Sequence, residues 1–174
     1  MSFWPPRESL PEQGAELTLM DALEQKILAL LAKDSERSLQ DLAGELGIPS
    51  STLHQKIKKL ETKGIIQGYR AKLDLRAVGL KTTSFVSLTP IDPAAPDNVA
   101  EQLAPIKEIE GCWSVAGPHS YIIKVNVSEP ADLEALLATI RAAANVRTET
   151  TVVLSTAFEN RPPKLPATNQ TDSI

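Results

Sequence analysis

The chain has 174 residues, of which 42% are hydrophobic and 23% are charged, a balance typical of one globular domain or two small ones. Its longest unbroken apolar run, 27–32, is far shorter than the roughly 20 residues that cross a bilayer, and no secretory signal is evident. One cysteine and two histidines exclude an internal disulfide and leave little for a metal centre. We therefore expect a cytoplasmic protein that uses no membrane span, metal or cofactor.

Charge is distributed unevenly along the chain. The net charge is −4, yet residues 54–72 hold six basic side chains and only one acidic side chain. Residues 80–158 instead carry five basic and nine acidic side chains. Such segregation indicates that one end of the chain has a nucleic acid partner.

Both ends of the chain are rich in proline. Residues 161–174 combine Pro, Thr, Asn and Ser without hydrophobic periodicity. A segment of this composition cannot bury enough apolar surface to offset the entropy lost on ordering. We predict a flexible N-terminal tail at 1–18 and a disordered tail at 159–174.

Three segments that follow the first tail show helical spacing of apolar residues. The first covers 19–31, the second opens at a capping-box-like Ser38 and stops at Gly47, and the third runs from Pro49 to Gly64. The short connection between the second and third segments is typical of a helix-turn-helix. Alternation over 65–73 predicts a strand beside it. The sequence thus predicts a winged helix-turn-helix at 19–72 and a linker at 73–80.

The remainder of the chain changes to alternating strand-like and helical patterns. Their order is βαββαβ over 81–158, which predicts a four-stranded antiparallel sheet with both helices on one face. The fold class is therefore α+β. The expected elements are a strand around 85–88, a helix at 97–106, strands at 109–115 and 121–127, a helix from 130 to 140 and a strand at 146–154.

The third predicted helix carries polar and basic residues away from its apolar side. Short polar residues near its start can reach base edges in the major groove, and its lysines can hold phosphates. A solvated helix face is the alternative interpretation. The residues concerned are Thr52, His54, Gln55, Lys56, Lys58 and Lys59.

A catalytic centre is poorly supported. Cys112 and His119 could form a nucleophile or a ligand pair, but the sequence positions no acid partner or third ligand. We expect Cys112 and Trp113 to pack in or beside the sheet, His119 to cap an exposed turn, and His54 to be a passive polar residue. No catalytic or metal-binding residue is assigned.

Several motifs resemble those of the Lrp/AsnC family, the feast/famine transcriptional regulators. They are D-A-L-E-Q-K-I-L-A-L-L-A-K-D at 21–34, S-L-Q-D-L-A-G-E-L-G-I at 38–48, S-S-T-L-H-Q-K-I-K-K-L-E-T-K-G-I-I-Q-G-Y at 50–69 and the later V-A-G-P-H-S-Y-I-I-K-V. The resemblance implies that a DNA-binding domain precedes a ferredoxin-like domain for effector binding and oligomerisation. It also implies dimers, which in this family often assemble further into octamers.

The resemblance implies two sets of site residues. Contacts to double-stranded DNA are expected from Ser51, Thr52, His54, Gln55, Lys56, Lys58, Lys59 and Arg70. A small-molecule effector, an amino acid or related metabolite, is expected near Gly117, Ser120, Tyr121 and Thr148.

This sequence departs from the family pattern in places. Ser120 stands where the family usually has Asp, and Gln55-Lys56 stand where arginines are common. The first change leaves the effector unassigned, and the second indicates a different preferred DNA sequence.

Two other functions remain open at this point. The layout also resembles siroheme decarboxylase subunits, whose tetrapyrrole cavity would need His119 with Arg141 or Arg147. A third possibility is a sensor that no longer binds DNA itself and co-assembles with a related regulator.

Overall fold

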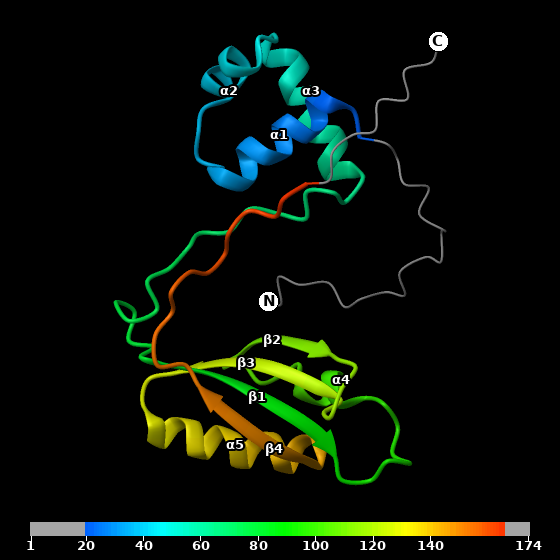
Figure 1. Ribbon diagram of the computed structural model, residues 1–174, viewed down its shortest axis with the longest axis vertical. Helices are drawn as coiled ribbons and strands as arrows, with labels where there is room; N and C mark the ends of the chain where they lie inside the picture. The colour runs from blue at the N-terminus through cyan, green and yellow to red at the C-terminus, as the bar shows by residue number, and fades with distance from the viewer. Residues whose placement is uncertain (1–19, 166–174) are drawn as a thin grey trace. The chain divides into compact units, whose positions relative to one another are not determined.

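The computed structural model describes residues 20–165, which form two compact units (Figure 1). One unit contains the residues up to Arg70 together with the segment from Asn160, and the other is Ala71–Glu159. The tail predicted at 1–18 and most of the tail predicted at 159–174 lie outside the described residues.

The N-terminal unit contains three helices, α1 (Ala22–Lys33), α2 (Leu39–Leu46) and α3 (Ser50–Thr62), as the periodicity predicts. Burial of their apolar stripes against one another stabilises the unit, since isolated helices of this length are marginal in water. The buried side chains of this core are Ile27, Leu42, Ala43, Leu53, Ile57 and Leu60.

The strand predicted over 65–73 does not form. These residues form bends or have no regular secondary structure, and they pair with no strand. Alternation makes a segment suitable for a sheet, but a strand also needs a neighbour, and the described part of the N-terminal unit provides none. The prediction was wrong because the alternation of one segment carries no information about its partner.

The C-terminal unit has the predicted βαββαβ order. Its four strands form one antiparallel sheet in the order β2-β3-β1-β4, so β1 and β3 are central. The α+β fold class predicted from the sequence is thereby confirmed. The elements are β1 (Thr82–Pro90), α4 (Val99–Leu103), β2 (Ile109–Ser114), β3 (Tyr121–Val127), α5 (Pro130–Ala144) and β4 (Val146–Val152).

The two faces of this sheet are covered to different extents by the rest of the unit. On the helix face, which α5 covers in Figure 1, Val86 and its cross-strand neighbour Ile123 are completely buried. Side chains alternate along a strand, so the intervening residues point to the other side, here called the outer face. Phe85 lies there beside Lys124 and is 40% exposed. The outer face thus has apolar surface that its own unit does not cover.

Candidate functional site

A three-residue turn joins α2 to α3. The Ser38 hydroxyl accepts the backbone N–H of Asp41 at 3.1 Å, which caps the start of α2. Gly47 ends the helix at φ +66°, a left-handed conformation that glycine adopts without strain. Pro49 then precedes the first residue of α3 and supplies no side-chain cap. The turn therefore places the start of α3 where the sequence predicts it.

One side of α3 belongs to the core and the opposite side is exposed. Leu53, Ile57 and Leu60 are at most 8% exposed. With 3.6 residues per turn, the opposite side is formed by Ser51, Gln55, Lys58 and Thr62, all of which are exposed. His54 and Lys59 are also exposed at its two flanks, and Thr52 is half-buried.

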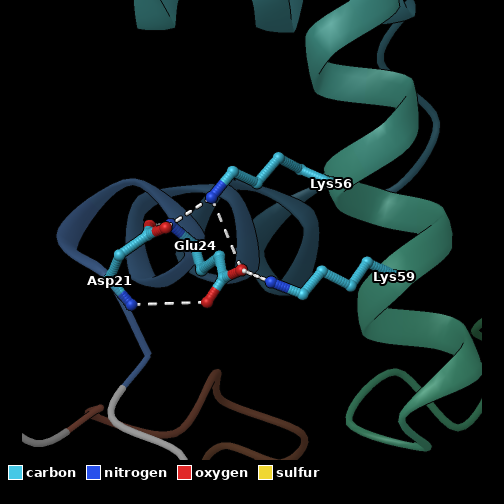
Figure 2. Close-up of polar contacts among 4 residues, drawn as sticks. All are labelled: Asp21, Glu24, Lys56 and Lys59. Atoms are coloured by element: carbon cyan, nitrogen blue, oxygen red, sulfur yellow. Dashed lines mark hydrogen bonds and ion pairs between the residues drawn. The ribbon is translucent and has the colours of Figure 1, made fainter.

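Lys56 lies on the flank of α3 that faces α1, where carboxylates hold it (Figure 2). Its Nζ donates a short hydrogen bond to Asp21 and lies 3.5 Å from Glu24 Oε1. Lys59 Nζ lies 3.4 Å from the same Glu24 oxygen. The Lys56 side chain is 24% exposed and that of Lys59 is 55% exposed. The placement of Lys56 differs from the expectation that it projects outward, whereas Lys59 remains exposed beside Glu24.

Asp21 and Glu24 are brought together by the start of α1. The Asp21 carboxylate accepts the Glu24 backbone N–H at 2.6 Å, and the Glu24 carboxylate accepts the Asp21 N–H at 3.3 Å, a reciprocal capping box. The Glu24 side chain is only 6% exposed. Sequence reasoning missed both residues, although the D-A-L-E spacing at a helix start could have indicated them.

The protonation equilibria of this cluster reflect its contacts. The hydrogen bond from Lys56 lowers the pKa of Asp21, and the same bond raises the pKa of Lys56. Burial acts to raise the pKa of Glu24, but the Asp21 N–H and Lys59 outweigh it, so that the pKa lies below its ordinary value. Asp21, Glu24 and Lys56 therefore carry their full charges near neutral pH.

Arg70, the remaining residue expected to contact DNA, lies beyond α3 in the extended segment that follows it. Its side chain is exposed. In the same unit, the nearby Tyr69 hydroxyl donates to Glu61 of α3 at 3.0 Å. This contact holds the extended segment beside α3.

The residues expected to bind an effector lie at one end of the sheet. Tyr121 and Thr148 flank Leu88 of β1 on its two sides, and all three point to the helix face. Ser120 is tied to β1, because its N–H donates to the Leu88 carbonyl at 3.0 Å. Gly117 lies exposed in the preceding turn.

Two of these residues have intramolecular partners for their hydroxyl groups. Tyr121 is 5% exposed, and its hydroxyl donates a short hydrogen bond to Asp97. That bond, together with burial, raises the pKa of Tyr121 to about 12. The Thr148 hydroxyl accepts from Arg141 Nη1 at 3.2 Å. Sequence reasoning missed Asp97, which lies 24 positions from Tyr121 and carries no motif.

His119 lies in the turn at 116–120, and its side chain, 27% exposed, reaches residues of the outer face. Its Nδ1 is 3.2 Å from the Thr89 hydroxyl, and its Nε2 is 3.5 Å from a Glu149 carboxylate oxygen. Arg141 bonds to Thr148 on the helix face, so His119 and Arg141 do not line a common cavity. This geometry does not support a site built from His119 and Arg141, whereas Arg147, the other arginine considered, lies opposite Thr89 on the outer face and is exposed.

Cys112, the remaining candidate for a nucleophile, is accounted for by packing. Cys112 packs against the sheet core, and burial raises the pKa of its thiol, which makes it a poor nucleophile at neutral pH. Within residues 20–165, no group of three or more His, Cys, Asp or Glu side chains is arranged to hold a metal ion. No helix in this described range is long and apolar enough to span a membrane.

The outer face carries a polar network beside its exposed aromatic rings. Lys124 Nζ bridges Glu110 at 3.1 Å and Glu159 at 2.5 Å, and its side chain is only 10% exposed. Trp113 of β2 is 50% exposed on the same face. This combination of apolar surface with a lysine whose charge is matched within the chain suits contact with another chain.

Two family models match successive parts of the chain. A model described as winged helix-turn-helix DNA-binding matches residues 20–67, and one described as Lrp/AsnC ligand binding domain matches residues 83–163. The HTH-type transcriptional regulator LrpA of Mycobacterium tuberculosis is 39% identical over 142 residues, which cover 82% of this chain and 95% of that protein. The regulator FL11 of Pyrococcus horikoshii is 28% identical over 80% of this chain and 93% of its own length.

Solved structures give the same result. The feast or famine regulatory protein of M. tuberculosis in complex with L-methionine has a TM-score of 0.80 and 39% identity, covering 82% of this chain and 99% of that chain. An AsnC family transcriptional regulator from Agrobacterium tumefaciens has a TM-score of 0.75 and 26% identity, with coverage of 84% and 97%. The fold, the position of the helix-turn-helix and these relatives agree, and the chain belongs to the Lrp/AsnC family of transcriptional regulators.

Proposed function

We propose that this regulator acts in the cytoplasm, binds specific DNA sequences through α3 and responds to an amino acid or related metabolite. The observation that carries the DNA-binding part is the exposed strip of α3 opposite its buried side. Ser51 and Gln55 lie in the first half of the helix, where a recognition helix reaches base edges. Lys58 follows one turn later, where it can hold a phosphate.

The proposed contacts divide into two kinds. Base readout is assigned to Ser51, Thr52, His54 and Gln55, since short polar side chains can donate to and accept from base edges. Phosphate contact is assigned to the exposed cations Lys58 and Arg70. It is also assigned to Lys59, whose side chain stays 55% exposed although its ammonium group lies 3.4 Å from Glu24. Lys56 is left out of this set, because Asp21 and Glu24 already hold its ammonium group.

The proposed effector site lies at the turn that contains Gly117 and Ser120, with Thr148 beside it. An amino acid is supported by the M. tuberculosis relative solved with L-methionine. Tyr121 is assigned a supporting role, since Asp97 occupies its hydroxyl. Calorimetric titration with the individual amino acids, methionine included, tests this part. Absence of heat for every amino acid would contradict it.

We further propose a homodimer, with octamers as a larger assembly, formed through the outer face. Phe85 and Trp113 expose apolar rings there that a second copy would bury. A symmetric dimer would present two copies of α3 to half-sites about 34 Å apart. Light scattering on the purified chain measures the assembly directly, and a monomer at all concentrations would contradict it.

In vitro selection of duplex DNA with the purified chain tests the main proposal, followed by binding measurements on variants. We expect Gln55→Ala to relax sequence preference, and Lys58→Ala to weaken binding to all sequences and reduce the salt slope by about one. Lys107→Ala, an exposed lysine of the C-terminal unit, is the matched control. Failure to enrich any sequence would contradict sequence-specific binding.

A further inference from the structure

A nearly buried carboxylate connects α1 to α3. Both oxygens of Glu24 are engaged: Oε2 accepts the Asp21 backbone N–H at 3.3 Å, and Oε1 lies 3.5 Å from Lys56 Nζ and 3.4 Å from Lys59 Nζ (Figure 2). Asp21 provides a second carboxylate for Lys56. The start of α1 therefore holds two lysines that lie about one turn apart on α3.

We propose that Glu24 is a positioning residue for DNA recognition, which with Asp21 fixes the orientation of α3 on α1 through Lys56 and Lys59. The inference rests on the proposed function, since it concerns how the helix assigned to DNA is held. In this role Lys56 contributes to DNA binding by geometry and not by contact with phosphate.

Burial makes this contact difficult to break. With its side chain 6% exposed, Glu24 loses much of its hydration and depends on its ionic partners. Removal of one partner leaves a charge in a site that water reaches poorly. Lys56, held by two carboxylates, therefore stays with them when phosphate approaches, and it releases no counterion from DNA.

Two simpler roles for Glu24 predict the opposite sign. If Glu24 only repelled phosphate, its neutralisation would strengthen DNA binding. If Glu24 only sequestered Lys56, its neutralisation would free that lysine for phosphate and again strengthen binding. A positioning role predicts weaker binding for Glu24→Gln, because the neutral amide holds the lysines less firmly.

The experiment measures binding of the full chain to a labelled mixed-sequence duplex at several KCl concentrations. The variants are Glu24→Gln, Lys56→Met, Lys56→Arg and the double variant Glu24→Gln/Lys56→Met. Lys58→Met is the matched control on the exposed strip of α3. Ile27→Val, which shortens a buried side chain of α1, controls for lost stability alone. Each measurement is made at a temperature at which circular dichroism shows every variant folded.

We expect Glu24→Gln and Lys56→Met each to weaken binding at least about threefold, and the double variant to be no weaker than either single variant. The salt slope of Lys56→Met should equal that of the wild type, whereas that of Lys58→Met should fall by about one. Lys56→Arg should restore binding, and Ile27→Val should bind like the wild type.

Three results would overturn the positioning role. They are equal or tighter binding by Glu24→Gln, a reduced salt slope for Lys56→Met, and equal weakening by Ile27→Val. A wild-type chain that binds no duplex would instead overturn the proposed DNA-binding function itself. The two failures are distinguished by the wild-type measurement.

Discussion

The indole ring of Trp113 lies against the backbone of Gly111, two residues earlier in β2. A Cβ atom at position 111 would lie 2.6 Å from Trp113 Cη2, closer than non-bonded carbon atoms approach. Residues two apart in a strand point to the same face, so the ring occupies the space of the absent side chain. A side chain at position 111 would therefore require the Trp113 ring to move from its place on the outer face.

Gly111→Ala should displace the indole ring and destabilise the C-terminal unit by about 1–3 kcal/mol, the usual cost of overpacking. Urea unfolding followed by tryptophan fluorescence measures the loss. Gly117→Ala is the control, because nothing lies within 4 Å of a Cβ there. Equal stability of the two variants would show that the ring moves aside without cost.

Acidification should weaken the contact between α1 and α3. The pKa values of Asp21 and Glu24 lie below their ordinary values of 3.8 and 4.5, so both groups bind fewer protons in the folded state. Their contribution to stability is present above the unfolded pKa values and is lost as pH falls through the folded ones. We expect the free energy of unfolding to fall more steeply below pH 4.5 for the wild type than for Lys56→Met. Urea titrations across this range provide the test, and parallel curves would contradict the expectation.

Tyr121→Phe separates a supporting role from a ligand contact. It removes the hydroxyl that donates to Asp97, and Asp97 is exposed and can bind water instead. We expect a loss of about 1.5 kcal/mol in stability, the lower end for hydrogen bonds to charged groups. Effector affinity, measured by calorimetry, should remain within a factor of about two of the wild type. Lost effector binding at unchanged stability would instead identify the hydroxyl as a direct contact.

Phe85→Thr tests the outer face as an assembly surface. Threonine keeps β propensity but removes most of the apolar area of the ring. Light scattering should show a shift toward smaller species on dilution. Ile91→Thr provides the control, since Ile91 is 60% exposed in the loop after β1. An unchanged mass for Phe85→Thr at every concentration would place the interface elsewhere.

The fold could largely be predicted from the sequence, because its elements are separated by clear local signals. The run Y-I-I-K-V-N-V between a turn and Pro130 gives β3 its observed bounds, Tyr121–Val127. The same reasoning failed at 65–73, where pairing depends on a partner strand that local alternation does not reveal. Local sequence signals thus predicted the helices and strands better than they predicted which strands pair.

The site was less predictable, because its contacts join distant parts of the chain. Helical spacing separates Lys56 from the apolar side of α3, but it does not reveal that α1 places two carboxylates beside that flank. Asp21 lies 35 positions before Lys56, and only the packing of the two helices brings them together. Tyr121 and Asp97 are joined in the same way, by a loop that the sequence does not position.

On the outer face, the charge of Lys124 is already matched within its own chain. Salt should therefore affect assembly and DNA binding differently. Glu110 and Glu159 satisfy Lys124 within one chain, so a neighbouring copy need supply no counter-ion. Association through that surface would then depend mainly on water leaving the aromatic rings, a driving force that moderate salt does not screen. Raising ionic strength should accordingly strip the regulator from DNA while leaving its subunits joined.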